Sequence, residues 1–172
     1  MLKINIKKNF IMKKIIIIGA GAMGSAFTVP CLENKNEVTL IGTHLEDELI
    51  NNIQLNKNFH PALNIELPAK LKVEKYERLK SILEGGVDII VAGVSSIGIA
   101  WFVDQIAKNY KKNLPIILLT KGLAIEDNEL ITLSDKIKKL LNKKGHEEVN
   151  VSAIKGPCLA AGLANKMRTG TV

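Results

Sequence analysis

The chain has 172 residues, 47% of them hydrophobic, which predicts one globular domain with a single sizeable core. No apolar run reaches the roughly 18 residues that a membrane-spanning helix needs, so no membrane span is expected. The formal net charge is +7, but its lysines gather near the N-terminus and in residues 136–144 without aromatic residues among them, which argues against nucleic acid as a partner.

Residues 1–13 are rich in lysine and are predicted to form a loose basic tail, followed by one domain over residues 14–172. The two cysteines, Cys31 and Cys158, are far apart and follow no pairing pattern. This indicates free thiols and a reducing, cytoplasmic location. No metal site is predicted.

Apolar runs and helix-like periodicity alternate along the chain, with residues 58–68 expected as a loop. Strands are predicted at residues 14–18, 37–41, 71–73, 87–92, 114–119 and 149–154, and a further one is expected to begin at 170–172. Helices are predicted at residues 22–34, 45–55, 76–83, 97–109 and 128–141, and a last one is expected to open at Gly156. This alternation predicts an α/β fold: a mainly parallel, doubly wound sheet of the Rossmann type with helices on both faces.

A glycine fingerprint of the form G-x-G-x-x-G follows the first strand directly. Gly19 permits a tight turn, Gly21 lets a pyrophosphate approach the backbone, and Gly24 lets the following helix pack closely. The positive end of that helix would face the phosphates. A glycine-rich turn that binds nothing is the alternative. The predicted cofactor loop consists of Gly19, Ala20, Gly21, Ala22, Met23 and Gly24.

Ligands of doubly wound sheets bind at the carboxyl ends of the strands, so the residues there are further cofactor-binding candidates. These residues are Thr43, His44, Val94, Ser95, Ser96, Gly156 and Pro157. Thr43 and His44 stand where an acidic residue would bind the ribose of NAD, and Glu46 comes late for that role. With nothing to repel a 2′-phosphate and no arginine to hold one, we expect NAD or NADP without a marked preference. The helix expected at Gly156 would favour anionic ligand groups.

Lys121, directly after a predicted strand, is the candidate catalytic residue. A lysine there can hold a substrate oxygen and stabilise negative charge during hydride transfer, although a surface lysine is the alternative. Ser95 and Ser96 could donate to the cofactor, cap the next helix, or do both. Cys158 is expected to be a packing residue rather than a reactive thiol. His60 could bind a ligand or serve only the structure.

Several short segments occur in order from about residue 14 to the end of the chain. They are Gly-Ala-Gly-Ala-Met-Gly-Ser (19–25), Asn-Glu-Val-Thr-Leu (36–40), His-Pro-Ala-Leu (60–63), Leu-Pro (67–68), Asp-Ile-Ile-Val-Ala-Gly-Val-Ser-Ser (88–96), Thr-Lys-Gly-Leu (120–123) and Gly-Pro-Cys-Leu-Ala (156–160). Together they resemble the N-terminal half of the NAD(P)-dependent glycerol-3-phosphate dehydrogenases. The family usually has Val-Pro-Ser where this chain has residues 94–96, Pro-Thr-Ala-Val near residues 168–172, and an acidic residue in place of Gly162, which indicates a divergent subgroup.

The resemblance implies an NAD(P)-dependent oxidoreductase that interconverts glycerol 3-phosphate and dihydroxyacetone phosphate, in carbohydrate and phospholipid metabolism. It implies that Lys121 lines the substrate site, and that the family's C-terminal helical substrate domain is absent from a truncated chain. We therefore expect little turnover by the chain alone, and self-association through the surface that the missing domain leaves. The alternatives are a dinucleotide-binding module without turnover, or another hydroxyacid dehydrogenase such as a ketopantoate-reductase-like enzyme.

Overall fold

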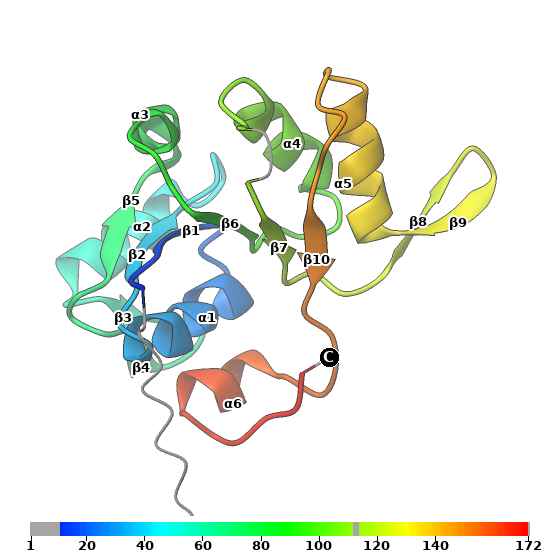
Figure 1. Cartoon of the computed structure of the whole chain (residues 1–172). Helices are drawn as coiled ribbons and strands as arrows, with labels where there is room; N and C mark the ends of the chain where they lie inside the picture. The colour runs from blue at the N-terminus through cyan, green and yellow to red at the C-terminus, as the bar shows by residue number, and fades with distance from the viewer. Residues whose placement is uncertain (1–10, 112–113, 172) are drawn as a thin grey trace, which may run out of the picture.

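The computed structural model describes residues 11–111 and 114–171, and its centre is a six-stranded sheet (Figure 1). The sheet order is β10-β7-β6-β1-β2-β5, and every pairing is parallel. Its strands are β1 (Lys14–Ile18), β2 (Glu37–Ile41), β5 (Lys72–Glu74), β6 (Ile89–Ala92), β7 (Ile116–Leu118) and β10 (Val151–Ala153). Numbered by their order along the chain, these six strands follow one another across the sheet as 6-5-4-1-2-3. Starting from the β5 edge, the order is 3-2-1-4-5-6, which is that of doubly wound dinucleotide-binding sheets. The predicted fold class is confirmed.

Helices cover both faces of this sheet (Figure 1). They are α1 (Ala22–Glu33), α2 (Asp47–Leu55), α3 (Leu79–Glu84) after the 3-10 turn η1 (Tyr76–Arg78), α4 (Ile99–Ala107), α5 (Leu133–Asn142) and α6 (Ala160–Ala164). Ile15 and Ile17 of β1 pack in one core cluster with α1, α2 and α6, whereas Ile16 and Ile18 pack in the other with α3, α4 and α5. The central strand is thus buried on both sides, as its unbroken apolar run predicts.

Two short hairpins lie outside the main sheet. The first joins β3 (Phe59–His60) to β4 (Ile65–Glu66), within the segment predicted to be a loop. The second joins β8 (Leu123–Glu126) to β9 (Glu129–Thr132) and projects from the body of the molecule (Figure 1).

The β8–β9 hairpin corrects the helix predicted at residues 128–141. Asp127 and Asn128 both have positive φ, 54° and 62°, as a two-residue hairpin turn of type I′ requires. The helix begins only after Thr132, whose hydroxyl accepts a hydrogen bond from the Asp135 N–H at 3.1 Å and caps α5. The cap therefore separates a strand from a helix where the apolar pattern predicts one continuous helix.

The helix predicted to open at Gly156 is also wrong. Gly156 has a φ of +104°, in the left-handed region, and the chain stays irregular until α6 begins at Ala160. Of the strand expected at residues 170–172, the first two residues are in no strand, and residue 172 lies outside the described residues.

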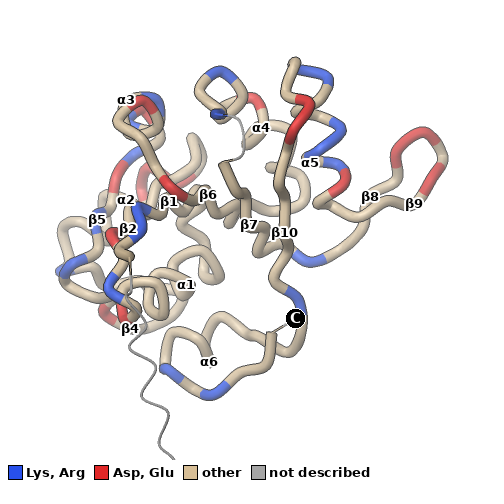
Figure 2. Tube along the Cα trace, in the orientation of Figure 1, with Lys and Arg blue, Asp and Glu red and all other residues tan. Residues whose placement is uncertain are grey.

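Charged residues are spread over the surface (Figure 2). Lys and Arg lie on α3, α5 and the segment after α6, with Asp and Glu among them and at the tip of the β8–β9 hairpin. The predicted basic tail falls largely on residues 1–10, outside the described residues. Within 11–111 and 114–171, no helix is long and apolar enough to cross a membrane. Cys31 lies in the core, where burial raises the pKa of its thiol to about 12.

Candidate functional site

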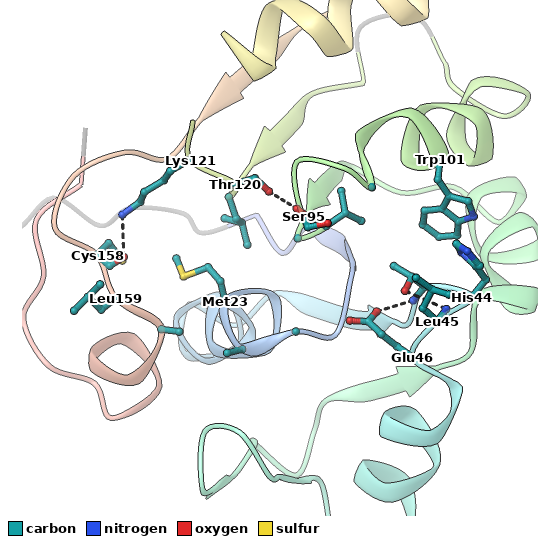
Figure 3. Close-up of a pocket in the computed structure, with 18 residues that line it drawn as sticks. Met23, His44, Leu45, Glu46, Ser95, Trp101, Thr120, Lys121, Cys158 and Leu159 are labelled. Carbon is teal, nitrogen blue, oxygen red and sulfur yellow. Dashed lines mark hydrogen bonds between the residues drawn. The ribbon is translucent and has the colours of Figure 1, made fainter. Parts of the chain in front are cut away.

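A cavity of about 650 Å³ opens at the carboxyl ends of β1, β2, β6 and β7 (Figure 3). It lies where the strand order reverses beside β1, the position at which doubly wound sheets bind ligands. The predicted site residues that line it are Gly21, Ala22, Met23, Thr43, His44, Val94, Ser95 and Lys121. The predicted site residues that do not line it are Gly19, Ala20, Gly24, Ser96, Gly156 and Pro157.

The three glycines of the fingerprint have the different steric roles that the sequence predicts. Gly19 turns the chain at φ +108°, and a Cβ there would lie 2.7 Å from the Gly93 carbonyl. A Cβ on Gly24 would lie 2.1 Å from the Gly19 oxygen, so only glycine permits this approach of α1. A Cβ on Gly21 would meet nothing closer than 3.9 Å, because this position faces the cavity.

Within the loop, Ala20 is fully buried, and both its N–H and its carbonyl group are hydrogen-bonded. Its N–H donates to Glu46 Oε2 at 3.0 Å, and its carbonyl lies 2.9 Å from the Ser25 hydroxyl and 3.0 Å from His60 Nε2. His60 Nδ1 accepts a hydrogen bond from the Leu63 N–H, so the ring proton is on Nε2, which donates. The structure therefore gives His60 a structural role: it fixes the loop from behind.

Helix α1 presents its N-terminus to the cavity. It runs over 12 residues from Ala22, and its cap residue Gly21 offers no side chain to its first N–H groups. The first turn contains no acidic residue. Backbone donors and the positive end of the helix dipole are thus available to an anionic group beside Gly21, Ala22 and Met23.

The β2 end of the cavity is aromatic and acidic (Figure 3). The His44 ring lies 5.0 Å from the Trp101 ring and 6.3 Å from the Tyr76 ring, centroid to centroid. Glu46 adds a carboxylate, whose Oε2 also accepts from the Thr43 N–H at 2.7 Å. The sequence analysis missed Trp101, which comes from α4, and set Glu46 aside as too late in the chain.

The β6 and β7 ends of the cavity are joined by a hydrogen bond from the Thr120 hydroxyl to the Val94 carbonyl. Helix α4 is capped by Gly98 without a side-chain hydrogen bond, so neither Ser95 nor Ser96 caps it. Ser95 lines the cavity, whereas Ser96 is exposed outside it.

Lys121 stands at the far end of the cavity from Glu46 (Figure 3). Its ammonium donates to the Gly156 carbonyl at 2.6 Å and to the Cys158 carbonyl at 3.2 Å. This turn therefore offers carbonyl oxygens, and the anion-binding helix end expected at Gly156 and Pro157 is wrong. Cys158 is buried, and its sulfur accepts from the Thr169 hydroxyl at 3.6 Å, as suits a packing residue.

Further lining residues were not predicted as site residues, because they are apolar or small and carry no binding group on their side chains. They are Leu45, Gly93, Gly98, Leu119, Leu159 and Ala160. Gly93 directly follows the predicted strand 87–92, and Leu119 is the last residue of the predicted strand 114–119.

A doubly wound sheet with a glycine fingerprint, a free helix N-terminus and a cavity at the switch point defines a nicotinamide dinucleotide-binding domain. The family described as "NAD-dependent glycerol-3-phosphate dehydrogenase N-terminus" matches residues 14–172, so the chain belongs to this family. The family consists of NAD(P)-dependent dehydrogenases, in agreement with the predicted cofactor, NAD or NADP.

Two curated relatives of the chain are also named glycerol-3-phosphate dehydrogenases. The chain is 34% identical over 158 residues to the NADP(+)-dependent glycerol-3-phosphate dehydrogenase of Archaeoglobus fulgidus, covering 92% of this chain and 45% of the relative. It is 30% identical over 161 residues to the glycerol-3-phosphate dehydrogenase [NAD(P)+] of Mesoplasma florum, with 91% and 45% covered. The crystal structure of glycerol-3-phosphate dehydrogenase from Coxiella burnetii shares the fold, with a TM-score of 0.75 at 23% identity over 93% of this chain and 46% of that one. The chain thus spans less than half the length of these relatives.

Proposed function

We propose that the chain is the cofactor-binding half of an oxidoreductase that interconverts glycerol 3-phosphate and dihydroxyacetone phosphate. The observation that carries this proposal is one continuous cavity that runs from the N-terminus of α1 to Lys121. A dinucleotide needs backbone donors for its pyrophosphate, and a carbonyl substrate needs a cationic donor for its oxygen. The cavity has both.

The proposed orientation of the dinucleotide follows from the residues at the two ends of the cavity. The pyrophosphate lies over Gly21 and the first turn of α1, and the adenosine lies toward Trp101 and Glu46 after β2. The nicotinamide then lies toward β6 and β7, beside Lys121. When bound, the nicotinamide ring supplies the hydride chemistry, and the protein supplies position and electrostatics.

In this proposal Lys121 polarises the substrate oxygen. A lysine ammonium has three N–H donors, and two of them are directed at the Gly156 and Cys158 carbonyls. These two bonds fix the ammonium, and the third donor is available to a substrate oxygen in the cavity. Negative charge that develops on this oxygen during reduction is thereby stabilised.

A dinucleotide-binding module without turnover is the second candidate. It would need only the cofactor end of the cavity, where the N-terminus of α1 offers backbone donors. For the described residues by themselves we propose cofactor binding as the activity.

The single tryptophan makes cofactor binding directly measurable. Trp101 lines the cavity, and its emission overlaps the absorption of a reduced nicotinamide ring. We expect NADH to quench this emission saturably at micromolar to low millimolar concentration. A chain whose emission and melting temperature stay unchanged in both millimolar NADH and millimolar NADPH would contradict the proposal.

Copies of the chain are also proposed to associate through the β8–β9 hairpin. Leu123, Ile125 and Leu130 are 55%, 75% and 67% exposed there, which is unusual for apolar side chains on one hairpin. Ile125→Lys should lower the mean mass measured by light scattering, whereas Leu55→Lys, at an 83% exposed site on α2, should not. A chain that is monomeric at all micromolar concentrations would refute this.

The cytoplasmic location expected from the sequence also remains a proposal. The structure supports it through Cys31 and Cys158, which are both buried free thiols.

A further inference from the structure

The Glu46 carboxylate lies between the glycine-rich loop and the loop that follows β2 (Figure 3). Its Oε2 accepts hydrogen bonds from the N–H groups of Ala20 and Thr43, so two backbone donors fix its direction. Its Oε1 is the nearest atom to the place of a Gly21 Cβ, at 3.9 Å. Among residues 11–111 and 114–171, no hydrogen-bond partner of Oε1 is found. One carboxylate oxygen is therefore anchored, and the other is directed at the side of the loop that faces the cavity.

A free carboxylate oxygen distinguishes the two nicotinamide dinucleotides. The adenosine ribose of NAD carries a 2′-hydroxyl, which donates a hydrogen bond to such an oxygen. NADP carries a 2′-phosphate instead, which only accepts hydrogen bonds and is negatively charged. It would be repelled by a carboxylate that two backbone bonds hold in place.

Among the described residues that line the cavity, no lysine or arginine lies beside Glu46 to offset this repulsion. Of the described residues that line the cavity, only Lys121 is a lysine or arginine, and it lies at the opposite end (Figure 3). The neighbouring His44 ring packs against Trp101. Glu46 is the one carboxylate among these described lining residues, so it sets the charge at this end.

We propose that Glu46 selects NAD(H) against NADP(H) by accepting a hydrogen bond from the 2′-hydroxyl of the adenosine ribose. This inference rests on the proposed cofactor site. It replaces the expectation from the sequence that NAD and NADP bind without a marked preference. The relative from Archaeoglobus fulgidus is named NADP(+)-dependent. Membership of the family therefore leaves the preference open, and individual residues at the ribose determine it.

The test is a pair of Trp101 quenching titrations, with NADH and with NADPH, at about pH 8. We expect the wild-type chain to bind NADH about 100-fold more tightly than NADPH, or better, because the 2′-phosphate and the Glu46 carboxylate repel each other. In Glu46→Gln the amide keeps the size of the side chain but removes its charge. NADH should then bind more weakly and NADPH more tightly, so that the preference falls to within about tenfold. Glu48→Gln, an exposed residue in the first turn of α2, removes the same charge and should leave the ratio unchanged.

A second measurement needs no variant. Displacement of NADH from the wild-type chain by AMP and by adenosine 2′,5′-bisphosphate tests the adenosine end alone, and AMP should compete much better. Equal competition, or equal weakening of NADH and NADPH in a folded Glu46→Gln chain, would mean that Glu46 only supports the loop, and would overturn the inference. Tight NADPH binding to the wild-type chain overturns it too, but leaves the proposed function intact. If no nucleotide binds, both the proposed function and the inference fail.

Discussion

Gly24→Ala is expected to disrupt the cofactor loop strongly, because the added methyl group has no space between α1 and the loop. Its Cβ would lie 2.1 Å from the Gly19 carbonyl oxygen, a backbone atom that cannot rotate away. Overpacking of this kind costs about 1–3 kcal/mol. If relaxation moves the N-terminus of α1 away from Gly19, the same energy appears as a loss of NADH affinity of about 5- to 150-fold.

The experiment compares thermal unfolding and NADH titration of Gly24→Ala and Gly162→Ala. Gly162 is also helical, in α6, but a Cβ there would be 3.7 Å from its nearest neighbour, the Thr169 methyl group. We expect Gly162→Ala to keep both stability and affinity. If the two variants behave alike, the close approach of α1 to the loop is not what shapes the site.

Lys121→Met should separate substrate binding from cofactor binding. The substitution removes the ammonium but keeps an unbranched side chain, and Lys121 lies at the opposite end of the cavity from the proposed adenosine site. We expect the NADH dissociation constant to stay within about threefold, a change below 1 kcal/mol. The response of bound NADH fluorescence to dihydroxyacetone phosphate should be lost. Wherever reduction of this substrate is measurable, its rate should fall by about 100- to 1,000-fold, as when one oxyanion donor is removed.

Lys155→Met is the matched control. Lys155 follows β10, is exposed, and is outside the cavity, so it loses the same charge near the same turn. It should respond to dihydroxyacetone phosphate like the wild-type chain. If Lys121→Met weakens NADH binding as strongly as substrate binding, Lys121 mainly holds the Gly156 turn in place, and the proposed role in polarising the substrate is wrong.

The sheet and its glycine loop could be predicted because their signals are local. A run of apolar residues forms a central strand in any such fold. Gly24 is required by its contact with the Gly19 backbone five positions earlier, and Gly19 by its own positive φ. The β8–β9 hairpin carried a local signal too, since Asp127 and Asn128 suit a type I′ turn, but the apolar Leu130 and Ile131 beside it matched a helical pattern.

The electrostatics of the site could not be predicted in the same way, because they depend on contacts between distant segments. Glu46 reaches Ala20 across 26 positions, and His60 reaches it across 40. The path of the chain after β2, rather than the number of residues counted from the fingerprint, brings the carboxylate to the loop. The Gly-Pro pair likewise favours a helix start, but Lys121 holds the Gly156 and Cys158 carbonyls in a different turn.

The hydrogen bonds that hold Ala20 in place affect both the rate and the entropy of nucleotide binding. Because Glu46, Ser25 and His60 hold this peptide without any ligand, the loop is preorganised, and a nucleotide need not order it on arrival. Amide hydrogen exchange at Ala20 should therefore be slow in the ligand-free chain and should slow little further when NADH is added. The association rate of a nucleotide should approach that expected for a rigid pocket. Differences in affinity among nucleotides should then appear as differences in their dissociation rates.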